Sequence, residues 1–249
     1  STMCGHAIMA LGRYAVDHGL VARVEPVTTV RIECPCGMVV ASVEVRDGKS
    51  GGVSFESVPA FLFAGDQAAD VPGFGRISFD IAYGGAFYAL ADCRQFGLEF
   101  GRDSADAFKK AATALTGAVR EAFPLDHPDH KDLAFLYGSI LTDGADEWNE
   151  APTKNVCIFA DAQLDRSPTG SGVTARLAAM HAKGQIAEGT ARIFESIAGS
   201  RFAGFVETTT KAGRFNAITA RVSGHAYYSG TAEFIVEEDD PLGPGFLIL

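Results

Sequence analysis

The side chains most able to do chemistry stand near the start of the chain, in the run Met3-Cys4-Gly5-His6. An apolar stretch follows over residues 7–16, and Gly19 is typical of a helix end. We therefore predict a buried helix with Cys4 at its N-terminus. Backbone N–H groups and the helix dipole favour a thiolate there, so Cys4 is a candidate reactive group. A cysteine that only fills the core beside a core helix is the alternative interpretation.

A second stretch, at residues 168–184, has the same order of small residues, apolar helix and final glycine. The aligned pairs are Cys4 with Thr169, Gly5 with Gly170, and His6 with Ser171. Two such units predict a duplicated architecture in which two helix N-termini face each other across one cleft. Backbone N–H groups of both helices would then bind an anion such as a carboxylate. Chance similarity between two helix starts is the alternative.

Composition limits the classes of protein to which the chain can belong. Its 249 residues are 47% hydrophobic and suffice for one large or two medium domains with their own cores. The net charge of −10 argues against nucleic acid or an anionic membrane surface as a partner. A small anionic substrate remains compatible with that charge, because a helix terminus creates a local positive field.

The search for targeting segments and the number of cysteines bear on the cellular compartment of the protein. No apolar run approaches the length of a membrane span, and no basic segment precedes an apolar one as in a signal peptide. The five cysteines are an odd number without the spacing of a disulfide framework. We therefore expect reduced thiols, a cytoplasmic location and no membrane partner.

Many strands and few helices make an α+β fold the prediction. One further helix is expected over residues 105–123, with Asp103 or Ser104 as its N-cap and Pro124 after its end. Gly84-Gly85 interrupts a strand pattern, which indicates a hairpin or a bent strand where the backbone lies close to another element. The predicted strands are 22–27, 28–33, 38–45, 53–61, 76–83, 87–91, 133–141, 155–159, 190–197, 202–208, 214–222, 225–228 and 232–236.

Two short segments have the residue types of a metal site but not its pattern. Cys34 and Cys36 are separated by one residue in a turn, and no second pair follows at the distance of a zinc site. The segment 126–130 contains two histidines among turn-forming residues and is typical of a solvated loop. We expect neither a metal ion nor a cofactor; a zinc protein that used both segments is the alternative.

Six motifs, in the same order along nearly the whole chain, resemble the proline racemase family. They are Met3-Cys4-Gly5-His6, Val71-Pro72-Gly73-Phe74-Gly75, Asp80-Ile81-Ala82-Tyr83-Gly84-Gly85, Asp165-Arg166-Ser167-Pro168-Thr169-Gly170-Ser171-Gly172, Glu195-Ser196-Ile197-Ala198-Gly199-Ser200-Arg201-Phe202 and Asp240-Pro241-Leu242-Gly243-Pro244-Gly245-Phe246. The resemblance implies a diaminopimelate epimerase-like fold of two pseudo-symmetric halves. Each half would be a curled mixed sheet around a central apolar helix, with the site between them.

The resemblance also implies a division of the chain and an assembly. Residues 1–53, with a C-terminal strand at 240–249, would form the first half, which carries Cys4. Residues 54–239 would form the second half, which carries Thr169. Most of the family's first half would precede Cys4, so we expect a truncated first half and a missing N-terminal segment. Family members are often homodimers, and we expect one here.

Roles for the site residues follow from the same resemblance. Cys4 would be the base, and Asp165 with His6 would hold the ring nitrogen of a proline-like substrate. The helix starts at Gly5 and His6 and at Gly170 and Ser171 would surround the substrate carboxylate. The racemases of the family have a cysteine at both helix starts, whereas this chain has Thr169 at the second. That departure resembles the trans-3-hydroxy-L-proline dehydratase branch.

The chemistry of threonine agrees with dehydration. Racemisation needs a second acid on the opposite face of the ring, and an alcohol is far too weak for that near neutral pH. In trans-3-hydroxy-L-proline the α-hydrogen and the hydroxyl lie on one face, so Cys4 alone would take the proton and return it to the leaving hydroxyl. Thr169 would orient the carboxylate or pack. Racemase or epimerase activity, and a non-catalytic truncated ligand-binding form, are the alternatives.

Overall fold

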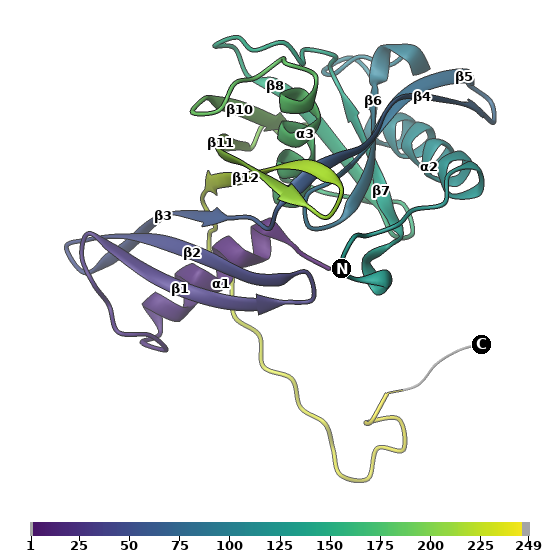
Figure 1. Ribbon diagram of the computed structural model, residues 1–249. Coiled ribbons are helices and arrows are strands. Elements are labelled where there is room, and N and C mark those ends of the chain that lie inside the picture. The colour runs from purple at the N-terminus through teal and green to yellow at the C-terminus, as the bar shows by residue number, and fades with distance from the viewer. Residues whose placement is uncertain (1, 246–249) are drawn as a thin grey trace.

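Helix α3 (Gly170–Ala182) lies inside a barrel of strands in the computed structural model, which describes residues 2–245 (Figure 1). The barrel strands are β4 (Ala60–Val71), β5 (Gly75–Tyr83), β6 (Phe87–Asp92), β7 (Leu136–Thr142), β8 (Thr153–Phe159), β10 (Ala191–Ser196), β11 (Arg201–Ala212) and β12 (Phe215–Gly224). They neighbour one another in the order β12-β11-β10-β8-β7-β6-β5-β4, and β12 also pairs with β4. This last pairing closes the ring of strands around α3.

Two parallel strand pairs give the barrel its mixed character. Strand β6 pairs in parallel with β7, and β8 pairs in parallel with β10. A parallel pair needs a long crossover, which is usually a helix. Helix α2 (Ala105–Ala122) connects the first pair and lies outside the barrel, whereas α3 connects the second and fills its interior (Figure 1). The short strand β9 (Gln163–Leu164) pairs with β8 just before α3 begins.

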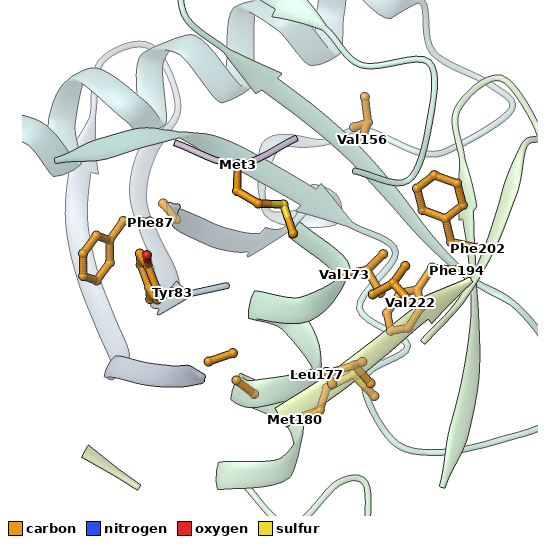
Figure 2. Packing of buried hydrophobic residues seen from close by; sticks show 14 of the residues in the cluster. Met3, Tyr83, Phe87, Val156, Val173, Leu177, Met180, Phe194, Phe202 and Val222 are labelled. Carbon is orange, nitrogen blue, oxygen red and sulfur yellow. The ribbon is translucent and has the colours of Figure 1, made fainter. Parts of the chain in front are cut away.

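The sequence of α3 suits its enclosure. Residues 170–180 are all buried, as expected for a helix that is apolar or small on every side. Val173 and Leu177 contact the inner face of β10 to β12, and Figure 2 shows them beside Phe194 and Val222. The interior of the barrel is therefore a packed core and leaves the ends of α3 as the places where a ligand can approach.

Helix α1 (Gly5–Asp17) lies outside the barrel on a layer of three antiparallel strands (Figure 1). These are β1 (Val27–Cys34), β2 (Gly37–Arg46) and β3 (Lys49–Glu56). The helix buries Ile8, Met9 and Val16 against the layer, while Leu11 is 51% exposed and Tyr14 45% exposed on its other side. The expectation of a helix buried within a curled sheet is therefore met by α3, whereas α1 is covered on one face by the strands that the structure describes.

Strand β12 joins the layer to the barrel. Its residues 221–224 pair with residues 53–56 of β3, and its Ala217 and Ile218 pair with β4. The chain crosses from the layer to the barrel at residues 57–59. The proposed division at residue 54 stays a prediction.

Most predicted elements are present, and the fold class is confirmed as α+β. The helix predicted at 105–123 is α2, and Ser104 caps it by accepting the Ala107 N–H at 3.4 Å. Within residues 2–245 no helix is long and apolar enough to cross a membrane.

The strands predicted at 225–228 and 232–236 are wrong, because these residues have no regular structure. Both segments are rich in apolar and aromatic residues, but in the described part of the chain they form no hydrogen-bonded ladder with another strand. Residues 241–244 form a turn and residues 240 and 245 are irregular, whereas 246–249 lie outside the described residues. The C-terminal strand predicted at 240–249 is therefore not found where it can be checked. The short 3-10 helices are η1 (Cys93–Phe96) and η2 (Lys131–Leu133).

Candidate active site

The N-termini of α1 and α3 meet directly. A Cβ added to Gly5 would lie 2.6 Å from Gly170 Cα, and one added to Gly170 would lie 2.7 Å from Gly5 Cα. Both would also press on the Phe55 ring, at 2.8 and 3.1 Å. Only glycine fits at either position, since real Cβ atoms do not approach backbone so closely. The two helix ends therefore direct their free N–H groups and positive dipole ends at one place.

Cys4 is the N-cap residue of α1 and its side chain is exposed. Its backbone is extended, with φ −130°, and its carbonyl accepts the Ile8 N–H at 3.0 Å to begin the helix. An accessible thiol at a helix start is a candidate base or nucleophile, and this role of Cys4 stays a prediction.

Thr169 is the N-cap of α3 and has φ +66°, a left-handed conformation that is costly for a β-branched residue. Side chains on both sides hold it there. Ser167 Oγ accepts the Thr169 N–H at 3.1 Å, and Asn155 Nδ2 donates to the Pro168 carbonyl at 3.2 Å. Backbone strain at a helix start beside a cavity is typical of a functional site.

The Thr169 hydroxyl is committed to a protein carboxylate. Thr169 Oγ1 donates to Asp165 Oδ2 at 2.8 Å, and Asp165 Oδ1 accepts the Ser167 N–H at 2.8 Å. The Thr169 hydroxyl proton is thus engaged by Asp165 and helps to fix the position of that carboxylate. The predicted role, orientation of the substrate's carboxylate, stays a prediction.

Cys157 on β8 lies beside Thr169 at the second helix start, a neighbour that the sequence analysis did not identify. Burial raises the pKa of the Cys157 thiol well above its usual range, the charge of Asp165 adds to this, and contact with the Thr169 hydroxyl opposes it. The thiol is fully buried and the cavity lining does not include it. Cys157 therefore does not replace the missing second cysteine. It was missed because strand β8 is distant from Thr169 in the sequence.

The turn between β5 and β6 lies against the first turn of α3. A Cβ added to Gly84 would be 2.3 Å from the Ser171 carbonyl oxygen and 2.4 Å from the Ala175 nitrogen. The predicted close backbone approach at Gly84 is confirmed. This approach brings Tyr88, on the following strand, within 2.8 Å of Ser171 Oγ through its phenol oxygen.

One small cavity, of about 30 Å³, lies where the helix ends meet. Its lining includes all the residues that the sequence nominated, which are Cys4, Gly5, His6, Asp165, Thr169, Gly170 and Ser171. His6 is half-buried, with its ring 6.0 Å from that of Phe202. The roles of these residues stay predictions, but the structure brings them together from elements about 160 residues apart in the chain.

An aromatic wall completes the cavity, and sequence reasoning missed it. It consists of Tyr88, Tyr137 and Phe159. The Tyr137 ring stacks on Phe159 at 5.2 Å and meets the Tyr88 ring edge-on at 5.8 Å. Each lies in a strand whose apolar pattern indicated only core. The glycine pair followed by Phe87-Tyr88 was the one signal that could have pointed to Tyr88.

The two segments with metal-like composition differ in how the structure places their side chains. Across residues 2–245 no group of three or more histidine, cysteine or acidic side chains is placed to hold a metal ion. Burial raises the pKa of Cys34, and the neighbouring Cys4 adds to it; burial and then Cys34 raise the pKa of Cys36 to about 12. His127 is buried against the Tyr83 ring, 4.6 Å away, so the solvated loop predicted at 126–130 is wrong at that residue.

The barrel around α3 and the cavity between two helix ends define an enzyme of the diaminopimelate epimerase-like architecture. The chain belongs to the proline racemase family, because the family model described as "Proline racemase" matches residues 1–247. It is 52% identical to "Trans-3-hydroxy-L-proline dehydratase" of Homo sapiens, over 100% of this chain and 72% of that protein. It is 53% identical to "Trans-L-3-hydroxyproline dehydratase" of Saccoglossus kowalevskii, over 100% of this chain and 76% of that protein.

Other members of the family are less similar in sequence but share the fold. "Proline racemase" of Clostridioides difficile is 40% identical, over 99% of this chain and 73% of that protein. A solved structure of a hydroxyproline epimerase from Agrobacterium vitis, with bound trans-4-OH-L-proline, has a TM-score of 0.91 and 29% identity. That match covers 99% of this chain and 70% of the other. The predicted family and fold are thus both confirmed.

Proposed function

We propose that this protein dehydrates trans-3-hydroxy-L-proline to pyrroline-2-carboxylate and water without a cofactor. One observation supports this above others: of the two helix starts at the cavity, only the first presents a side chain fit for acid–base work. Cys4 is an exposed thiol, whereas the Thr169 hydroxyl donates to Asp165. The human and acorn-worm relatives, at 52% and 53% identity, carry dehydratase names and so agree with it.

The proposed mechanism starts with the α-proton. The Cys4 thiolate removes it, while the N–H groups at the starts of α1 and α3 stabilise the negative charge that develops next to the carboxylate. The C3–O bond then breaks, a C2–C3 double bond forms, and Cys4 returns the proton to the departing hydroxyl as water. The resulting enamine shifts a proton to become the cyclic imine.

The arrangement of the second helix start supports a single acid–base residue. Thr169 has an alcohol, which holds its proton far too tightly to act as a base near neutral pH. Cys157 is fully buried behind it, with a raised pKa, so it supplies no second base at the cavity. Asp165 and His6, both at the cavity wall, would hold the ring nitrogen.

Turnover of trans-3-hydroxy-L-proline, followed with a colour reaction for the cyclic imine, tests the proposal. Parallel incubations of L-proline and trans-4-hydroxy-L-proline in deuterated water test the rival activity. We expect imine from the first substrate and neither inversion nor α-deuterium in the other two. Deuterium with inversion and no imine would instead establish racemisation or epimerisation.

The resemblance to the family also leads us to propose a homodimer, and the odd number of free cysteines favours the reducing cytoplasm. Light scattering on the eluting peak of a gel-filtration column measures the mass of the assembly. A monomer mass at micromolar concentration would contradict the dimer.

A further inference from the structure

Tyr88 reaches the first turn of α3 from strand β6. Its phenol oxygen is 2.8 Å from Ser171 Oγ, and both side chains are buried. Both also line the cavity that contains Cys4 and Asp165. Two hydroxyls that share one hydrogen bond still have a second proton to donate. A buried polar pair in the wall of a cavity is therefore able to bind the occupant of that cavity.

The direction of this hydrogen bond decides which proton is left over. A phenol O–H is far more acidic than an alcohol O–H, and an alcohol oxygen is the better acceptor. The geometry allows either oxygen to donate, and on acidity we assign the shared proton to Tyr88, with Ser171 Oγ as the acceptor. Burial raises the pKa of the Tyr88 phenol well above its usual range, so the donor stays protonated through the neutral and alkaline range.

The remaining proton belongs to Ser171, the second residue of α3. Free N–H groups and the positive end of the helix dipole occupy the same place, and they favour a negatively charged ligand. The N-terminus of α1 points to the same spot, since Gly5 and Gly170 are in contact. A carboxylate at the junction would thus meet the Ser171 hydroxyl together with backbone donors.

We propose that Tyr88 is a positioning residue for the substrate carboxylate: its phenol donates to Ser171 Oγ and thereby directs the Ser171 hydroxyl proton at the bound carboxylate. The proposed function supplies the identity of the ligand as a hydroxyproline, and the inference rests on it in that respect. The aromatic neighbours Tyr137 and Phe159 complete this wall, and a hydrogen bond to a charged oxygen is stronger than one between neutral groups.

Tyr88→Phe removes the phenol oxygen and keeps the ring. Calorimetry would compare two flat five-membered rings as probes, pyrrole-2-carboxylate and its neutral carboxamide. We expect the variant to bind the carboxylate about ten-fold more weakly and the carboxamide within about two-fold of the wild type. Equal weakening of both probes, or of neither, would overturn the proposal, since a change in pocket shape does not distinguish charge.

Steady-state kinetics provide a second test of the role proposed for Tyr88. With trans-3-hydroxy-L-proline we expect Tyr88→Phe to raise KM about ten-fold and leave kcat within about three-fold, because the carboxylate is held in the ground state and in the transition state alike. Ser171→Ala should raise KM similarly, and the double variant should add little, because the two hydroxyls act as one unit. Full additivity would contradict the coupling.

Tyr83→Phe is the matched control, since Tyr83 is buried on strand β5 among Phe61, Phe87 and His127 and away from the cavity. We expect it to leave KM and the affinity for both probes unchanged. Wild-type protein that fails to turn over trans-3-hydroxy-L-proline would reject the proposed function alone. The comparison of carboxylate with carboxamide binding would still decide the role of Tyr88, because it needs no turnover.

Discussion

The two helices that meet at the cavity have very different surroundings. Helix α3 is enclosed by the barrel, and its residues 170–180 are all buried. Helix α1 rests on three strands and exposes Leu11 and Tyr14 on its other side. The enclosed helix carries the residues that are fixed by hydrogen bonds, Thr169 and Ser171, whereas the half-covered helix carries the accessible thiol of Cys4. The proposed function therefore places binding and orientation on the enclosed helix, and the reactive group on the more open one.

The largest difference should appear in the chemistry of the two helix starts. We expect Cys4→Ser to reduce kcat by on the order of 10³-fold or more, because it removes the proposed acid–base group. Thr169→Ala should leave a measurable rate, reduced roughly ten-fold, because it only releases Asp165. The cyclic-imine assay measures both.

The neighbouring Cys34→Ser is the control for Cys4 and should retain most of the activity. Both cysteine variants should unfold like the wild type in urea. A dead Thr169→Ala variant with unchanged ligand binding would disprove the mechanism with a single acid–base residue.

A leucine-to-alanine substitution should also affect the free energy of unfolding very differently in the two helices. Leu177 is fully buried in α3, so Leu177→Ala should lower the free energy of unfolding by about 2–5 kcal/mol. Leu11 is half-exposed on α1, and Leu11→Ala should change the free energy of unfolding by less than about 0.5 kcal/mol. Urea unfolding followed by circular dichroism measures both. Equal losses would mean that α1 is as well covered in solution as α3.

The contact between the helix ends should tolerate no side chain. Gly170→Ala places a Cβ 2.7 Å from Gly5 Cα, so we expect the helix starts to separate and kcat/KM to fall roughly 100-fold. Gly117→Ala, within α2 and with nothing near its added Cβ, is the matched control. It should leave activity unchanged and stabilise the protein by about 0.5–1 kcal/mol. Unchanged activity in Gly170→Ala would contradict the joint anion site.

The smallest expected effect is on the pH dependence of stability. It compares His127, which packs against the barrel, with His18 at the end of α1. Burial lowers the pKa of His127 below that of the unfolded chain. The unfolded state therefore binds more protons between the two pKa values, and stability falls as the pH drops from about 6.5 through the folded pKa. His127→Asn should flatten this slope, which for one proton is at most about 1.4 kcal/mol per pH unit.

His18→Asn, which removes an imidazole that is exposed at the end of α1, is the control variant. Urea titrations between pH 7 and pH 5 measure these slopes. If both variants and the wild type showed the same dependence of stability on pH, the prediction that folding lowers the pKa of His127 would be wrong.

Local chemistry explains what was predictable in the fold and the site. The starts of α1 and α3 were recognisable because small residues precede an apolar run and glycine follows it. Ser104 was recognisable as one of two candidate caps, with Asp103, because both precede a helical pattern. The strands predicted beyond residue 224 failed, because apolar residues form a strand only where a neighbouring strand exchanges hydrogen bonds with them. Residues 225–245 form no such ladder in the described part of the chain.

The sequence by itself determined the candidate chemistry, since a cysteine at one helix start and a threonine at its counterpart limit which protons can move. It also determined the family, through motifs that extend along nearly the whole chain. Only the tertiary structure decided that Thr169 donates to Asp165, that Cys157 lies buried behind it, and that Tyr88 meets Ser171. These contacts join strands and helices distant in the chain. They depend on barrel closure and on the fit of Gly5 to Gly170, which no local pattern encodes.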